Sequence, residues 1–415
     1  MATLKVGFLL PTRDWIVLGD REPSALIEQA RLAEDLGFDS VWAGDSPVTR
    51  PRADPLMLLS AVAAVTERVT LGTAVLLPAL RHPILLAHQL ATLDRISDGR
   101  LIAGMGAGFP HPNTEAQFDA LGIEFKRRVS RTEESIDVMR QLWAGAAVSY
   151  QGTHFDFRDV TLEPKPAQAG GPPIWLAGSG AAALRRVGRL ADGWLPYPPT
   201  SQTYADEWSV VQEEVRLRGP ASGEVARLRG LASGGAATQG AHAAGGVSLP
   251  SGPVAGEAAT RGAHAAGGVS LPSGPVAGEA ATLDAHAGAD VSPSNSPVSS
   301  EAGQVRHLVE PAWGEGVSVV TPALYATVCL DEDRERARGR LRTSIERYYN
   351  APLEFIETIQ ATFAGSAADA VDWLNAYALA GVRHVVIRFA VDDYRGALEE
   401  FAERVLPRLH EGVRS

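Results

Sequence analysis

Residues 24–43 read SALIEQARLAEDLGFDSVWA and contain a complete transition from helix to strand. Leu26, Ala30 and Ala33 recur at the spacing of one helix face, and Gly37 follows as a stop signal. Residues 38–43 are then apolar and aromatic, as in a buried strand. Because another apolar run at residues 4–10 precedes this helix, the segment predicts a β–α–β unit of a parallel sheet.

The same alternation continues toward both ends of the chain. We predict eight strands, at residues 4–10, 38–43, 69–77, 100–106, 173–177, 193–196, 317–330 and 384–390. Helices are predicted between them, among them 130–143 after a capping box, 203–217 and 353–363. With an 87-residue interruption set aside, 328 of the 415 residues remain, which suits an α/β fold of the (β/α)8 TIM barrel type.

The interruption lies at residues 218–304, which hold 17 Gly, 21 Ala and no aromatic residue. Residues 240–260 recur letter for letter at 262–282, but the repeat carries too few apolar side chains to stack. We therefore predict a disordered, low-complexity insertion that divides the barrel into 1–217 and 305–415. The spacing of His242, His264 and His286 along such a segment preorganises no metal site, so we predict none.

The overall composition restricts the classes of partner. The chain carries 38 Lys and Arg against 49 Asp and Glu, for a net charge of −11, so neither nucleic acid nor an anionic membrane surface is an expected partner. The first residues run directly into a strand, and no stretch of 18 apolar residues occurs. We expect a soluble cytoplasmic protein.

The scarcity of cysteine and lysine argues against disulfide formation and Schiff-base chemistry. Cys329 is the single cysteine, so no internal disulfide can form. Lys5, Lys126 and Lys165 are the only lysines, and none ends a predicted strand. A Schiff-base mechanism, which needs a lysine in the site, is therefore not expected.

In a barrel of this type the chemistry lies at the carboxyl ends of the strands. Small residues dominate there: Gly106 follows the fourth strand, and Gly178, Ser179 and Gly180 follow the fifth. No carboxylate pair of the kind that serves acid–base catalysis follows any strand. The mouth suits a flat, bulky ligand, and the Gly-Ser-Gly turn before a helix suits a phosphate, although such a turn also occurs without a ligand.

Several runs of residues together resemble the bacterial luciferase-like group of flavin-dependent oxidoreductases. They are LAEDLGFDSVW at 32–42, LGTAV at 71–75, LDRISDGR at 93–100, GMGAG at 104–108, IWLAGSG at 174–180, ADGW at 191–194 and AGVRHVV at 380–386. The resemblance covers residues 4–215 and 317–409 in the family's order and omits the insertion. It implies a (β/α)8 barrel that binds reduced FMN or the deazaflavin coenzyme F420 at its mouth.

The resemblance also implies positions for the cofactor. The non-proline cis peptide that backs the ring in relatives falls at Ala74-Val75, and Gly106 gives the ring clearance. The cofactor phosphate is expected at Gly178, Ser179 and Gly180.

Candidate catalytic residues are Asp45, His82 and His111. In deazaflavin-dependent sugar-phosphate dehydrogenases of this group, a histidine follows the aspartate and a glutamate follows the fourth-strand glycines. This chain holds Ser46 and Phe109 at those places, which argues against that activity. Asp45 either contacts the polar edge of the cofactor or a substrate, or caps the following turn. His82 either faces the cofactor or caps the next helix, and His111 either meets substrate or lies in solvent.

The leading hypothesis is a monooxygenase that uses reduced FMN, supplied by a separate flavin reductase, and O2 on a small organic substrate. The alternatives are an F420-dependent hydride-transfer enzyme and a flavin-binding protein without turnover. A barrel lyase or hydrolase without redox cofactor is disfavoured by the scarcity of lysine and of carboxylate pairs. The resemblance further suggests a homodimer.

Overall fold

The structure is a computed structural model that describes residues 3–19, 22–232 and 320–410, with the backbone alone described at 219–232. Eight parallel strands form a closed barrel. They are β1 (Lys5–Leu9), β2 (Ser40–Ala43), β3 (Thr70–Thr73), β4 (Leu101–Met105), β7 (Ile174–Leu176), β8 (Gly193–Trp194), β9 (Thr321–Leu330) and β11 (His384–Phe389). The order is β1-β2-β3-β4-β7-β8-β9-β11, and β11 pairs with β1 to close the ring. The predicted (β/α)8 barrel is therefore confirmed.

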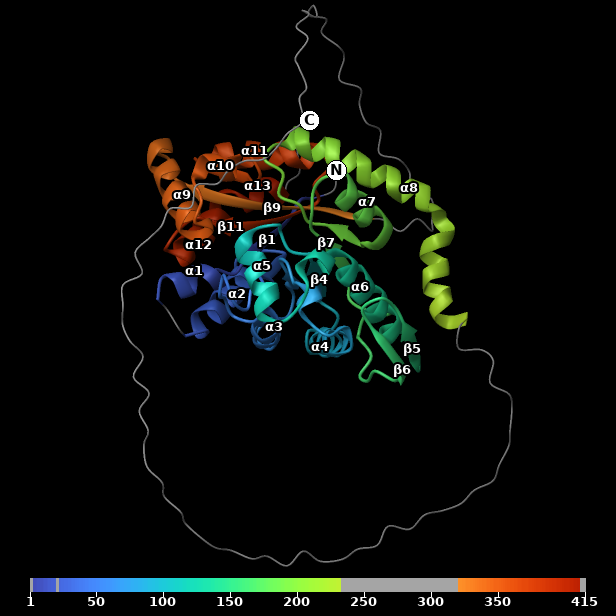
Figure 1. The fold of residues 1–415 in the computed structure, drawn as a ribbon. Coiled ribbons are helices and arrows are strands. Elements are labelled where there is room, and N and C mark those ends of the chain that lie inside the picture. Colours follow the sequence, from blue (N-terminus) through green and yellow to red (C-terminus); the bar gives the residue numbers. More distant parts are fainter. Residues whose placement is uncertain (1–2, 20–21, 233–319, 411–415) are drawn as a thin grey trace, which may run out of the picture. The chain divides into compact units, whose positions relative to one another are not determined.

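Helices surround the strands (Figure 1). They are α1 (Thr12–Val17), α2 (Ser24–Asp35), α3 (Pro55–Ala63), α4 (Pro83–Ile96), α5 (Pro112–Ala120), α6 (Arg128–Ala144), α7 (Ala181–Leu190), α8 (Ser201–Ala232), α9 (Arg334–Tyr349), α10 (Leu353–Glu357), α11 (Ala367–Leu379), α12 (Tyr394–Arg404) and α13 (Leu406–His410). A hairpin of β5 (Val148–Gln151) and β6 (Asp156–Val160) lies where the sequence predicts one. In the described part of the chain, no helix is both long and apolar enough to cross a membrane.

Two tryptophans fill the barrel interior. The rings of Trp42 and Trp175 lie 5.3 Å apart, and the His384 ring stands edge-on to both. Glycine makes room for them, because a Cβ atom on Gly72 would come within 2.1 Å of the Trp42 ring. This packing closes the barrel interior with side chains, so that a ligand can enter only at an end.

The structure corrects one predicted helix into a strand. Residues 353–363 do not form a single helix: α10 ends at Glu357, and Ala361–Gly365 form strand β10. β10 pairs in parallel with the second half of β9, from Ala361 opposite Ala326 to Gly365 opposite Leu330. Pairing with a strand some 35 residues earlier is a tertiary effect, which local helix periodicity does not report.

Other boundaries also differ. The capping box predicted at Ser130 is absent, because α6 begins at Arg128 and the Ser130 hydroxyl donates to the Arg127 carbonyl instead. Helices α1 and α5 occupy loops for which no helix is predicted. The helix predicted at 203–217 continues to Ala232, beyond the predicted start of the insertion. The rest of the predicted insertion, including its three histidines, lies outside the described residues.

A deletion tests the predicted insertion. Removing residues 233–304, with α8 kept intact and a short linker added, is expected to change the melting temperature by less than about 3 °C, because the sequence predicts no core residues there. Thermal unfolding of the full chain and the deleted chain checks this. A fall of about 10 °C or more would show that the repeat packs on the barrel.

Candidate cofactor and substrate site

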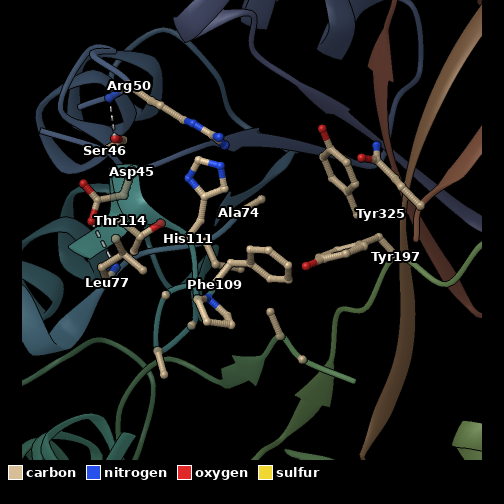
Figure 2. Close-up of a pocket in the computed structure, with 18 of the residues that line it drawn as sticks. Asp45, Ser46, Arg50, Ala74, Leu77, Phe109, His111, Thr114, Tyr197 and Tyr325 are labelled. Carbon is tan, nitrogen blue, oxygen red and sulfur yellow. Dashed lines mark hydrogen bonds between the residues drawn. The ribbon is translucent and has the colours of Figure 1, made fainter. Parts of the chain in front are cut away.

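A cavity of about 640 Å³ opens at the carboxyl ends of the barrel strands. Residues that follow five of the strands line it, together with Leu9 at the end of β1: Asp45 after β2, Ala74 and Val75 after β3, Gly106 to Phe109 after β4, Ala177 to Ser179 after β7, and Tyr197 after β8. Figure 2 shows Phe109 and His111 on one side and Tyr197 and Tyr325 on the other. The volume lies in the range of small-molecule and cofactor sites.

One wall of the cavity is built from residues with small side chains. The Ala74-Val75 peptide bond is cis, as the resemblance implies. Gly106 lies against it, because a Cβ atom on Gly106 would be 2.8 Å from Val75 Cγ2. Gly178 and Ser179 line the same cavity. Five of the six predicted cofactor residues are thus brought together around one space.

Gly180, the sixth, is not among the residues that line the cavity. Its N–H donates to Glu207 Oε1 of α8 at 3.2 Å, so this donor is already occupied by a carboxylate. The other oxygen, Glu207 Oε2, is buried and has no hydrogen-bond partner among the described residues. Burial raises the pKa of Glu207. A negative group therefore sits at the turn where a phosphate is predicted.

Asp45 lines the cavity, but its carboxylate is already held. Oδ2 accepts the Leu77 N–H at 3.0 Å and Arg81 Nη1 at 2.6 Å, and Oδ1 accepts Arg81 Nη2 at 3.0 Å. Figure 2 shows the hydrogen bond between Asp45 and Leu77. Leu77 follows the cis peptide by two residues, so this hydrogen bond anchors that segment. The geometry favours an anchoring role over acid–base chemistry, since a bidentate arginine holds the carboxylate as an acceptor.

His82 is not among the residues that line the cavity. It caps α4: Nδ1 accepts the Ile84 N–H at 3.4 Å, and the ring stands edge-on to Phe155 at 5.5 Å. The sequence alone does not show whether His82 faces the cofactor or caps the helix, because Pro83 follows it in either case.

His111 does line the cavity. It caps α5, since Nδ1 accepts the Asn113 N–H at 3.1 Å, which leaves Nε2 for the ring proton. Burial, and then the charge of Arg50, lower the pKa of His111, so the ring is neutral at pH 7. Figure 2 shows the Arg50 side chain beside this ring.

The two residues that depart from the sugar-phosphate dehydrogenase pattern both lie in the cavity wall. Ser46 Oγ donates to Gln117 Oε1 at 2.9 Å, and both residues are buried. Phe109 is 54% exposed and forms an apolar rim. Neither position offers a group that can carry a proton between donor and substrate.

Sequence reasoning missed the positive charge of the site. The cavity lining includes four arginines, Arg50, Arg52, Arg128 and Arg186, and one carboxylate, Asp45. Arg50 and Arg52 lie in the loop that follows β2, so their position in the sequence is a signal that could have identified them. Tyr348 and Tyr349 also line the cavity, but they end helix α9, and no local signal marks them.

Comparison with known proteins gives a family match. The family model described as luciferase-like monooxygenase matches residues 4–232. The F420-dependent glucose-6-phosphate dehydrogenase of Microbacterium testaceum is 38% identical over 185 residues, which cover 42% of this chain and 52% of that protein. The enzyme of the same name from Amycolatopsis mediterranei is 35% identical over 200 residues, covering 46% and 57%. The chain spans about half the length of the curated relatives it matches.

Solved structures share the fold at low identity. An F420-dependent secondary alcohol dehydrogenase in complex with an F420-acetone adduct superposes with a TM-score of 0.63 and 17% identity, covering 99% of both chains. The FMN complex of the oxygenating constituent of 3,6-diketocamphane monooxygenase from Pseudomonas putida gives a TM-score of 0.60 and 15% identity, covering 100% of this chain and 98% of that one. At these identities the likeness concerns the fold.

Proposed function

Because the chain belongs to the luciferase-like monooxygenase family, we propose that it is an oxidoreductase that uses coenzyme F420 for hydride transfer to or from a small organic substrate. The wall around the cis peptide Ala74-Val75 carries this proposal, since it offers a ring-sized surface beside a cavity of about 640 Å³. The curated relatives named as F420-dependent enzymes support F420 over FMN.

The residues present fit such a group. The side-chain atoms nearest to Gly106 belong to Val75 and Ala177, so a planar ring system can lie against this part of the wall. The arginines that line the cavity favour a cofactor with acidic groups, because the one carboxylate among the lining residues is already paired with Arg81. When bound, F420 supplies a ring carbon that accepts or donates a hydride.

The protein's own residues position and shield the reaction. Ala74 and Val75 support the ring face, and Ser179 with the backbone of Gly178 holds the phosphate. Phe109 and Tyr197 narrow the mouth and exclude water. His111 donates a hydrogen bond from Nε2 to a substrate oxygen, since its Nδ1 is occupied by the Asn113 N–H.

The substrate differs from glucose 6-phosphate. Ser46 and Phe109 stand where the resemblance places the acid–base pair of the sugar-phosphate dehydrogenases, and Ser46 is engaged with Gln117. A second candidate, monooxygenation with reduced FMN and O2, is favoured by this lack of a proton-transferring pair, because an oxygen-activating flavin needs little more than positioning and exclusion of water.

Equilibrium titration tests the proposal. The purified full-length protein is titrated with F420, with FMN and, anaerobically, with reduced FMN, and fluorescence and absorbance report binding. We expect F420 to bind at least about tenfold more tightly than either flavin, and glucose 6-phosphate to leave F420 oxidised. Preferential binding of reduced FMN would replace the proposal by the monooxygenase, and binding of none of the three would refute both.

Glu207 supplies a prediction about the phosphate turn. Glu207→Gln is expected to tighten F420 binding about tenfold, because a unit charge about 6 Å from a phosphate at an effective dielectric of about 40 is worth about 1.4 kcal/mol. The glutamine Oε1 can still accept the Gly180 N–H. Asp206→Asn, a change of the same charge at an exposed neighbour on α8, is the control and is expected to have little effect.

The pH dependence of F420 binding checks the same prediction. Burial raises the pKa of Glu207, so wild-type affinity is expected to rise as the pH falls through that raised pKa and the carboxylate is neutralised. The Glu207→Gln variant should lack this rise. An equal rise in both proteins would mean that Glu207 does not face the phosphate.

A further inference from the structure

Four arginines gather beside the cavity from parts of the chain that are far apart in sequence. Arg13 lies in α1, Arg50 and Arg52 follow β2, and Arg388 lies in β11; we call them the arginine cluster. The Cζ atoms of Arg388, Arg13 and Arg52 lie 4.1, 5.2 and 5.8 Å from the ring centre of Tyr348. Arg50, Arg52 and Tyr348 line the cavity itself. The cluster therefore borders the space in which a ligand binds.

A carboxylate balances one of the four positive charges of the cluster in the described part of the chain. Asp14 pairs with Arg388 at 2.9 Å. Arg13, Arg50 and Arg52 form no ion pair with any residue that the structure describes. The Tyr348 ring stabilises a cation over its face and its hydroxyl interacts with the Arg52 guanidinium, but neither group is a carboxylate that would balance the charge. An excess of positive charge is concentrated here although the whole chain has a net charge of −11.

Several N–H donors of the cluster are buried without an acceptor. Among the described residues, Nε of Arg13, Nε of Arg52, and Nε and Nη1 of Arg388 have no hydrogen-bond partner. Arg388 is 1% exposed, so bulk solvent does not reach these donors. Burial, and then the neighbouring charges of Arg52 and Arg50, lower the pKa of Arg13. Of these residues Arg52 lines the cavity, so an anion bound there can approach its unsatisfied N–H and reduce the repulsion among Arg13, Arg50 and Arg52.

Gly44 places the cluster next to the proposed cofactor wall. A Cβ atom on Gly44 would lie 2.1 Å from Arg52 Nη1 and 3.3 Å from the carbonyl oxygen of Ala74. The Arg52 guanidinium therefore lies over the Gly44 backbone, close to the residue that begins the cis peptide. A side chain at position 44 would displace the guanidinium.

We propose that Arg50 and Arg52, backed by Arg13 and Arg388, form an anion subsite that binds a carboxylate or phosphate group of the ligand beside the redox ring. The fork of N–H groups on arginine matches the oxygens of either anion. The anion belongs to the substrate or to an acidic group of the cofactor, and the test separates these sources. This anion subsite rests on the proposed function, because that function identifies the neighbouring ring as F420.

Inorganic phosphate is the probe. Calorimetric titration compares the full-length wild type, Arg52→Met and Arg127→Met, each with and without saturating F420. Arg127 is the control because it is exposed, pairs with Glu124 and is not among the cavity-lining residues. We expect Arg52→Met to weaken phosphate binding at least tenfold and Arg127→Met to leave it within twofold of wild type.

The F420 arms identify the source of the anion. If phosphate still binds the F420-saturated protein in an Arg52-dependent way, the anion belongs to the substrate. If F420 abolishes that binding and Arg52→Met also weakens F420 binding at least tenfold, the anion belongs to the cofactor. Equal phosphate affinity in the wild type and Arg52→Met, with or without F420, would overturn the proposal.

Folding and the proposed function are monitored separately. Circular dichroism and the melting temperature show whether Arg52→Met folds, and Arg52→Lys, which keeps the charge but not the fork, is expected to bind phosphate with intermediate affinity. A wild-type protein that binds phosphate through Arg52 but binds no F420 would refute the proposed function and leave the anion subsite standing. Binding of F420 without Arg52-dependent phosphate binding would refute the anion subsite and leave the proposed function standing.

Discussion

Asp14→Asn will lower the free energy of unfolding by about 3–5 kcal/mol, the largest effect on stability that we expect from a single substitution in this protein. Both side chains of the Asp14–Arg388 pair are almost fully buried, with 2% and 1% exposed. The substitution keeps the size of the side chain and removes the negative charge that faces Arg388. The buried guanidinium is then left uncompensated among three further arginines, which makes the loss larger than for an isolated pair.

Urea unfolding of the wild type and the variant measures this loss. The double variant Asp14→Leu with Arg388→Met is expected to regain most of the stability, because a buried ion pair replaced by apolar side chains of similar size is often nearly neutral. Glu124→Gln, which breaks the exposed pair with Arg127, is expected to cost less than about 1 kcal/mol. A loss below about 1 kcal/mol for Asp14→Asn would show that the cluster does not depend on this carboxylate.

His384 is expected to make the barrel lose stability as the pH falls. Burial lowers the pKa of His384 to about 3, whereas the unfolded residue titrates at about 6.5. Above pH 6.5 both states are neutral and the group adds no pH dependence. Below pH 6.5 the unfolded chain binds a proton that the native chain refuses, so stability falls by about 1.4 kcal/mol per pH unit, or about 2 kcal/mol by pH 5. The fall continues to about pH 3.

The structure explains why the ring stays neutral. Ser40 Oγ accepts the Trp42 indole N–H at 2.7 Å and lies 2.6 Å from His384 Nε2, so its hydroxyl proton is available to an unprotonated Nε2 of a neutral ring. A protonated ring would turn this acceptor into a second donor, inside a barrel that holds Trp42 and Trp175 against it.

Unfolding free energies measured from pH 8 to pH 5 test this prediction. His384→Asn removes the titrating group, so its stability should fall less steeply below pH 6.5 than that of the wild type, whatever its stability at pH 8. His88→Asn is the matched control, since His88 lies exposed on α4, and its slope should equal that of the wild type. Parallel curves for the wild type and His384→Asn would contradict the assignment.

Local signals in the sequence determined most of the barrel. Apolar runs such as residues 38–43 and stop signals such as Gly37 depend on neighbours within a few residues, so they predicted the eight barrel strands. Strand β10 was not predicted, because its pairing partner β9 lies some 35 residues earlier. The position of the cis peptide at Ala74-Val75 came from the resemblance and is present in the structure.

The candidate site was also predictable from the sequence only in part. That Asp45, Gly106 and Ser179 share a cavity follows from the rule that residues after parallel strands meet at one end of a barrel, a rule that needs only the strand boundaries. His82 also follows a barrel strand, but its side chain caps α4. The direction of a side chain depends on the local backbone conformation, which the strand boundaries do not specify.

By itself, then, the sequence determined the barrel, the end at which the site lies and the small residues of its wall, since all of these follow from short-range periodicity and strand order. Only the tertiary structure decided that the Asp45 carboxylate is held by Arg81, that Glu207 accepts the Gly180 N–H at the turn where a phosphate is predicted, and that arginines from three separate segments surround Tyr348. The physical reason is that charge pairing and desolvation act between atoms brought together by folding, over sequence separations of up to 374 residues, and no local pattern records them.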